Sequence, residues 1–191
     1  MSQFSNLEQD ELLNLAIESI RKGEHGSAIS YLKEGVERFP EDAKLAYILG
    51  AEFAQISLYD KAEIEMQRAI SLDPSLHTAS FQLGLLQMTL GKVPEARQTW
   101  TNLDVLPEQH ALHLFKSGLE SLADGDFVRS RALLEHGIAV NDFSPDLTRD
   151  MQNVLSEMPA AQELPAEGQD AAGQGSVWFS AYNTQDDEHK D

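Results

Sequence analysis

Two histidines, His110 and His113, have the spacing in this chain most suggestive of chemistry. Residues three apart on a helix can supply two zinc ligands, but a zinc site needs a third and a fourth donor. The nearest carboxylate, Glu108, does not share a helix face with both histidines, and the chain contains no cysteine. We therefore interpret the pair as partly exposed histidines at a helix start, and we expect neither a metal nor another cofactor.

Motifs of the common enzyme classes are also missing. The sequence has no G-x-S-x-G elbow, no phosphate loop and no H-E-x-x-H motif. The adjacent acids Glu41 and Asp42 precede an expected helix, where negative charge favours the helix dipole. These acids therefore need no catalytic role, and the sequence predicts a protein that is not an enzyme.

Charge excludes further classes of partner. The 191 residues include 32 acidic and 14 basic side chains, which gives a formal net charge of −18. Nucleic acids and acidic lipid surfaces attract clustered Lys and Arg, so we expect neither as a partner. No apolar run reaches about 18 residues, and residues 1–11 lack the basic and apolar segments of a signal peptide. We therefore expect a cytoplasmic protein.

A 34-residue spacing organises the elements of the chain. One column at this spacing is large and apolar: Leu32, Met66, Trp100 and Leu134. Another column is mostly small: Gly35, Ala69, Leu103 and Gly137. Small residues let two helices approach closely while large ones fill the neighbouring space, so each copy is expected to be a pair of packed helices.

The apolar residues within each copy follow helical spacing. In the first copy the pattern breaks at Gly23, and a second run ends at Pro40. No stretch alternates apolar and polar residues as a strand would. The sequence therefore predicts an all-α fold, with a lead-in at 1–8 and repeats at 9–42, 43–76, 77–110 and 111–144.

The second copy resembles a tetratricopeptide repeat. The resemblance rests on Leu49, Gly50, Phe53, Ala62, Met66, Ala69 and Pro74. The other copies depart from the pattern: Pro107 falls one place early in the third, and Asp142 replaces proline in the fourth. The resemblance covers residues 9–144 and implies a right-handed α-solenoid of four helix-turn-helix repeats that interacts with other proteins.

The chain after the repeats has two expected parts. Ser144 and Pro145 start a predicted capping helix over 145–158, whose apolar stripe would cover the open end of the repeat stack. Residues 159–191 form an acidic tail without helical periodicity, a composition that predicts disorder. An aromatic segment at 177–182 interrupts this tail.

In tetratricopeptide arrays the first helices of successive units line a concave face, so the resemblance identifies the residues that a partner would meet. The expected groove residues are Leu13, Ile17, Tyr47, Ile48, Phe81, Leu85, Phe115 and Leu119. Phe81 and Phe115 are expected to be the most exposed of these. The alternative is that these residues pack between neighbouring first helices and against the cap.

Related co-chaperone domains hold a peptide carboxylate on this face with a clamp of Lys, Arg and Asn. The matching places here hold Leu13, Ile17, Ile48, Thr78 and Gln82. Binding of chaperone tails is therefore not implied. The apolar groove suits an extended or helical segment with aliphatic or aromatic anchors.

The tail contains anchors of the same kind. The expected docking segment consists of Val177, Trp178, Phe179 and Tyr182. One hypothesis is that it docks in the groove of its own chain or of a second copy, which would produce self-association. The alternatives are recognition by another protein, an anchor on the cap, or no specific role.

Together these features predict a non-enzymatic adaptor or scaffold that binds a protein or peptide client in an apolar concave groove, modulated by its own tail. The alternative is a dedicated chaperone for a secreted or assembling bacterial protein, because small acidic secretion chaperones have similar repeats. A mimic of nucleic acid is disfavoured, since the acids are spread over the repeats.

Overall fold

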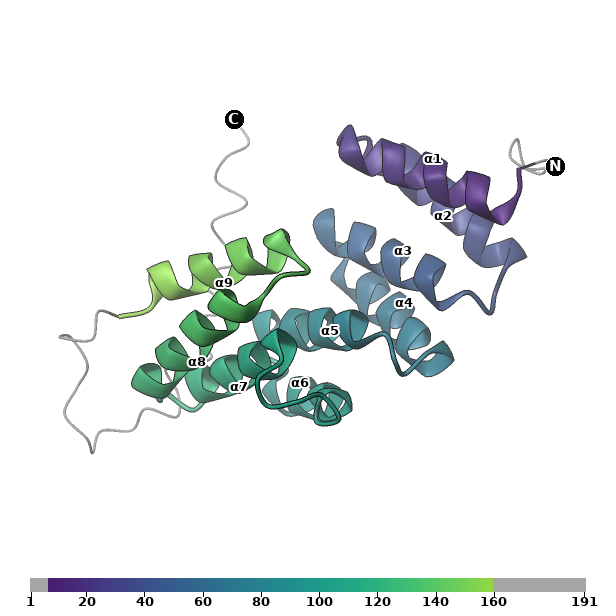
Figure 1. Cartoon of the computed structure of the whole chain (residues 1–191). Helices are drawn as coiled ribbons and strands as arrows, with labels where there is room; N and C mark the ends of the chain where they lie inside the picture. Colours follow the sequence, from purple (N-terminus) through teal and green to yellow (C-terminus); the bar gives the residue numbers. More distant parts are fainter. Residues whose placement is uncertain (1–6, 160–191) are drawn as a thin grey trace. The chain divides into compact units, whose positions relative to one another are not determined.

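The computed structural model describes residues 7–159, which contain nine α-helices and one short 3-10 helix and no strand (Figure 1). The prediction of an all-α helical-repeat fold is confirmed. The elements are α1 (Gln9–Arg21), α2 (His25–Arg38), α3 (Ala43–Gln55), α4 (Tyr59–Leu72), α5 (His77–Thr89), α6 (Val93–Trp100), η1 (Thr101–Leu103), α7 (Ala111–Ala123), α8 (Phe127–Val140) and α9 (Pro145–Glu157).

The chain forms two compact units, which divide between Leu86 and Gln87 inside α5. In the first unit, α2 packs against α1 and α3, and α3 packs against α4. In the second unit, α7 packs against α6 and α8, and α8 packs against α9. Helices α1, α3, α5 and α7 begin 34 residues apart, while the division into four repeats stays a prediction.

Small residues allow the close helix pairs. A Cβ built on Gly50 of α3 would lie 2.7 Å from Cγ of Met66 on α4. A Cβ on Gly118 of α7 would likewise lie 2.7 Å from Cδ2 of Leu134 on α8. Any side chain at either position would separate the two helices, so these two glycines set the crossing distance of their helix pairs.

The turn between the two helices of a pair contains one residue in the left-handed backbone conformation, with a positive φ. Gly23, between α1 and α2, has φ +72°. Ser57, at the same place between α3 and α4, has φ 60°, a conformation that costs a non-glycine residue about 1 kcal/mol or more. Because this left-handed residue lies at the same place in both helix pairs, the second helix of each pair starts at the same point of its repeat.

Helix α9 begins where the sequence predicts a capping helix. The Ser144 hydroxyl accepts a hydrogen bond from the amide of Leu147 at 3.3 Å, and this caps the helix. Leu147, Met151 and Met158 are buried, so the predicted apolar stripe faces the protein. The predictions for residues 1–6 and 160–191, including the disorder of the tail and its segment Val177, Trp178, Phe179 and Tyr182, lie outside the described residues.

Among residues 7–159, no helix has both the length and the apolar character needed to cross a membrane.

Candidate functional site

Five of the eight expected groove residues are half-buried side chains on the first helices of the first unit. They are Leu13 and Ile17 on α1, Tyr47 and Ile48 on α3, and Leu85 on α5. Leu13 and Ile17 are one helical turn apart and share a face of α1, while their neighbours Leu12 and Ala16 are fully buried. These five residues, called the first-helix face below, therefore lie at the border between core and surface.

The other three expected groove residues are core residues. Phe81, Phe115 and Leu119 are each 0% exposed, so the expectation that Phe81 and Phe115 are the most exposed is wrong. For Phe115 the reason is Gly137 on α8, where a Cβ would lie 2.5 Å from two atoms of the aromatic ring. The ring occupies the space that the missing side chain leaves, and a partner cannot reach it.

A hydrogen bond joins α3 to α5 at the first-helix face. The Tyr47 hydroxyl donates to Oε1 of Gln82 at 3.0 Å. Burial raises the pKa of Tyr47 to about 12, so the hydroxyl keeps its proton at any physiological pH. Because Oε1 is the acceptor, the amide Nε2 of Gln82 has both hydrogens directed elsewhere, and no acceptor for them occurs among the described residues.

The N-terminal ends of α1 and α3 are also joined. The Gln9 side chain donates to Asp42, whose carboxylate caps α3 by accepting from the amides of Lys44 (2.7 Å) and Leu45 (3.1 Å). The prediction that Glu41 and Asp42 precede a helix is confirmed. Beside this junction lies an open depression of about 730 Å³, lined by Gln9, Phe39, Pro40, Glu41, Asp42, Ala43, Lys44, Leu72 and Asp73.

The charges around this depression have local partners. Hydrogen bonds from the hydroxyl and the amide of Ser75 hold the pKa of Asp73 below its usual range. Asp42 is occupied by the cap of α3. Both carboxylates therefore stabilise chain turns, and the depression contains no arrangement with an evident chemical task.

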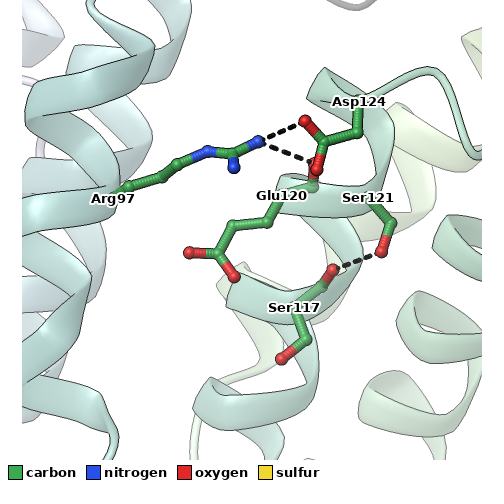
Figure 2. A network of polar contacts seen from close by, with 5 residues as sticks. All are labelled: Arg97, Ser117, Glu120, Ser121 and Asp124. Carbon is green, nitrogen blue, oxygen red and sulfur yellow. Dashed lines mark hydrogen bonds and ion pairs between the residues drawn. The ribbon is translucent and has the colours of Figure 1, made fainter.

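The second unit contains a polar network that the sequence did not indicate (Figure 2). Nη2 of Arg97 on α6 donates to Asp124 at 2.5 Å and to the carbonyl of Glu120 at 3.5 Å. Burial raises the pKa of the Glu120 carboxyl, and the nearby cations Lys116 and Arg97 oppose that shift. Lys116 is itself buried and pairs with Asp104.

This network stabilises the packing of α6 and η1 on α7 and forms no catalytic arrangement. Arg97 and Asp124 are 27 residues apart in the sequence. Their pairing depends on how α6 packs against the end of α7, and a helical pattern within either segment gives no signal of it. The available hint was the charged pair Lys116 and Glu120 on a helix that is mostly apolar.

The histidine pair is structural at its first member. His110 is the N-cap of α7, and its Nδ1 accepts a hydrogen bond from the amide of Leu112 at 3.2 Å. Its ring lies 5.7 Å from the ring of Phe143. Within residues 7–159 no three His, Asp or Glu side chains come together in a way that could hold a metal ion. The interpretation of His110 as a helix-start residue is confirmed.

The comparisons with known proteins identify the fold. No protein-family model and no curated protein sequence matches this chain. The crystal structure of PilW, described as a widely conserved type IV pilus biogenesis factor, has a TM-score of 0.61 at 14% identity, covering 98% of this chain and 97% of PilW. MamA (residues 41 to the end) from Desulfovibrio magneticus RS-1 has a TM-score of 0.59 at 16% identity, covering 96% of this chain and 97% of MamA.

A second MamA crystal structure has a TM-score of 0.59 at 15% identity and covers 95% of each chain. At identities of 14–16%, these similarities show the fold alone. The chain is thus similar over nearly its whole length to helical-repeat proteins, and its own fold is a helical-repeat fold.

Proposed function

We propose that this protein is a non-enzymatic adaptor that binds a segment of another protein on the first-helix face. The observation that carries the proposal is the set of half-buried apolar side chains on the first helices α1, α3 and α5, namely Leu13, Ile17, Tyr47, Ile48 and Leu85. The hydrogen bond from Tyr47 to Gln82 joins two of these helices. Side chains of this kind have apolar surface left to bury and are already held in place by the helices that carry them. Rigid helices lose little conformational freedom on binding, so less of the gain from burial is offset by the cost of ordering this protein.

The polar pair gives this face a way to orient a ligand. The Tyr47 hydroxyl holds Oε1 of Gln82, which leaves the Nε2 hydrogens of Gln82 for an acceptor on the ligand. A main-chain carbonyl is the acceptor that every peptide offers. The favoured ligand is therefore a peptide with aliphatic or aromatic anchors and a free carbonyl between them.

Charge favours a basic ligand. The chain has a formal net charge of −18, so Lys or Arg flanking the apolar anchors speeds association, and this effect weakens as salt screens it. The proposed ligand class is thus a short apolar segment with basic flanks.

The test begins with selection from a displayed peptide library on the full chain, followed by calorimetry with the selected peptides. Ile48→Asp and Tyr47→Ala are expected to weaken binding about tenfold or more, because an unpaired charge or a lost aromatic anchor costs at least about 1.4 kcal/mol. The matched control is Ile64→Asp, which changes a 65% exposed residue on α4 and should leave affinity unchanged. Equal losses in the site and control variants would contradict the proposal, and so would a library that yields no binder.

The second candidate function is a dedicated chaperone for an assembling protein, and the description of PilW as a pilus biogenesis factor favours it. A chaperone would bind its client before the client folds, in a one-to-one complex. Co-expression that keeps a folded, independently stable partner bound would favour the adaptor instead.

A further inference from the structure

The depression beside the N-terminal ends of α1 and α3 has an apolar part that the described residues leave partly open. Phe39 and Leu72 line it as half-buried side chains, and Pro40, which also lines it, is exposed. Its volume of about 730 Å³ lies within the range of about 300–1,000 Å³ that is usual for ligand pockets. The depression therefore has room for a large apolar side chain.

The described part of the chain begins beside this depression. Nη1 of Arg38 donates to the carbonyl of Leu7 at 2.5 Å, and the guanidinium carbon of Arg38 lies 5.2 Å from the centroid of the Phe39 ring. Since a C–N bond adds about 1.3 Å, the Leu7 carbonyl oxygen lies within about 9 Å of that centroid. Gln9 also lines the depression and donates to Asp42. All of these residues belong to the first compact unit, so their geometry does not depend on how the two units are arranged.

The residues that precede Leu7 contain one aromatic side chain. Residues 1–6 read M-S-Q-F-S-N, and Phe4 comes three residues before Leu7. Three residues span at most about 11 Å, and this limit is set by bond lengths alone, for any conformation of the chain. Because the Phe39 ring is within about 9 Å of the Leu7 carbonyl, the depression lies within the reach of Phe4.

The polarity of residues 1–6 also suits the depression. They include no charged side chain, so neither the carboxylates that line the depression nor the ammonium of Lys44 opposes their approach. Ser5 and Asn6 can donate hydrogen bonds, and the carboxylates of Glu41 and Asp42 accept them. An aromatic anchor beside two donors thus matches an apolar surface with acceptors at its edge.

We propose that the chain's own segment 1–6 docks in the depression, with the Phe4 ring against Phe39 and Leu72. The ring removes from water the apolar surface that the ends of α2 and α4 leave open. The contact fastens the chain before α1 to the ends of these two helices. This inference is independent of the proposed peptide site on the first-helix face, because no added ligand takes part in it.

Magnetic resonance of the leucine methyl groups tests the docking in the full chain. An aromatic ring shifts the methyl signals of a side chain that it contacts, so Phe4→Ala is expected to move the signals of Leu72. The Phe39 ring is present in both proteins, and the difference therefore reports on Phe4. Leu58, which is 40% exposed and precedes α4, lies about 21 Å from Leu72 along the helix. Its signals are expected to stay in place.

The matched control is Ser5→Ala, which changes the same segment without removing a ring and should leave the Leu72 signals at their wild-type positions. Circular dichroism verifies that each variant is folded. Four results would overturn the proposal: Leu72 signals that Phe4→Ala leaves in place, equal changes in Phe4→Ala and Ser5→Ala, equal changes at Leu58 and Leu72, or a Leu72 shift that grows with protein concentration, which would place Phe4 of a second copy in the depression.

Discussion

Replacing Gly137 by alanine should destabilise the second unit through one contact. A Cβ at this position would lie 2.5 Å from Cδ1 and from Cε1 of Phe115, and 3.3 Å from Cβ of Leu114. Carbon atoms this close repel strongly. The Phe115 ring is 0% exposed, so it can move aside only by displacing other core residues.

Two opposing terms determine the size of the effect. Overpacking a well-filled core costs about 1–3 kcal/mol. Alanine is favoured over glycine inside a helix by about 0.5–1 kcal/mol. The expected net loss in the free energy of unfolding is therefore about 1–2 kcal/mol, or a fall in Tm of about 5–10 °C for a unit of about 100 residues.

Gly35 on α2 provides a matched control from the same column of the sequence. A Cβ there would lie 3.1 Å and 3.3 Å from the terminal methyl groups of Leu45. The end of a leucine side chain moves by a few tenths of an ångström at small cost. The helix propensity of alanine offsets that cost, so Gly35→Ala is expected to change stability by less than about 0.5 kcal/mol.

Urea unfolding measures both variants, each in a Trp178→Phe background. Trp100 then reports the unfolding of the second unit, in which it is fully buried, and circular dichroism reports all the helices. Gly137→Ala should lower the urea midpoint without changing the slope. The packing argument fails if Gly137→Ala unfolds at the wild-type midpoint, or if Gly35→Ala is destabilised as much.

Three other substitutions test separate contacts. Burial raises the pKa of the Glu120 carboxyl, so the unfolded chain loses this proton at a lower pH than the folded chain does. The free energy of unfolding therefore falls as the pH rises through the raised pKa. Glu120→Gln should remove that fall and stabilise the protein at pH 7 by less than about 1 kcal/mol. Thermal unfolding at pH 4 and pH 7 measures this difference. Asp42→Ala removes the cap of α3 and should cost about 1–2 kcal/mol in urea unfolding, with a smaller loss for Asp42→Asn. Tyr47→Phe deletes the hydrogen bond to Gln82 and should cost about 0.5–1.5 kcal/mol. In an ultraviolet titration it should remove the contribution that Tyr47 is expected to make near pH 12.

The sequence was sufficient to predict the helical-repeat fold because that fold depends on local patterns and close neighbours. The spacing of apolar residues predicts each helix, and the break in that spacing at Gly23, which has a φ of +72°, predicts where the first helix pair reverses. The small residues opposite large ones, such as Gly50 opposite Met66, indicate pairs that cross closely. Each of these signals lies within one repeat length, so periodicity alone reveals it.

The candidate site was predicted only in part. The sequence correctly places Leu13, Ile17 and Tyr47 on the first helices, but it assigned Phe81 and Phe115 to the surface although both are buried. The position of a residue within the 34-residue repeat identifies the helix face on which it lies, but it does not show which other residues cover that face. Whether Phe115 is exposed depends on Gly137, 22 residues away on the next helix.

Tertiary structure alone decided which residues meet across helices. The bond from Tyr47 to Gln82 and the pairing of Arg97 with Asp124 both involve packing between segments. No periodicity within one segment encodes such a meeting, because it depends on the angle and separation at which two helices pack. The sequence by itself therefore determined that the chain is a helical-repeat protein, and the packing of its helices decided which side chains remain available to a partner.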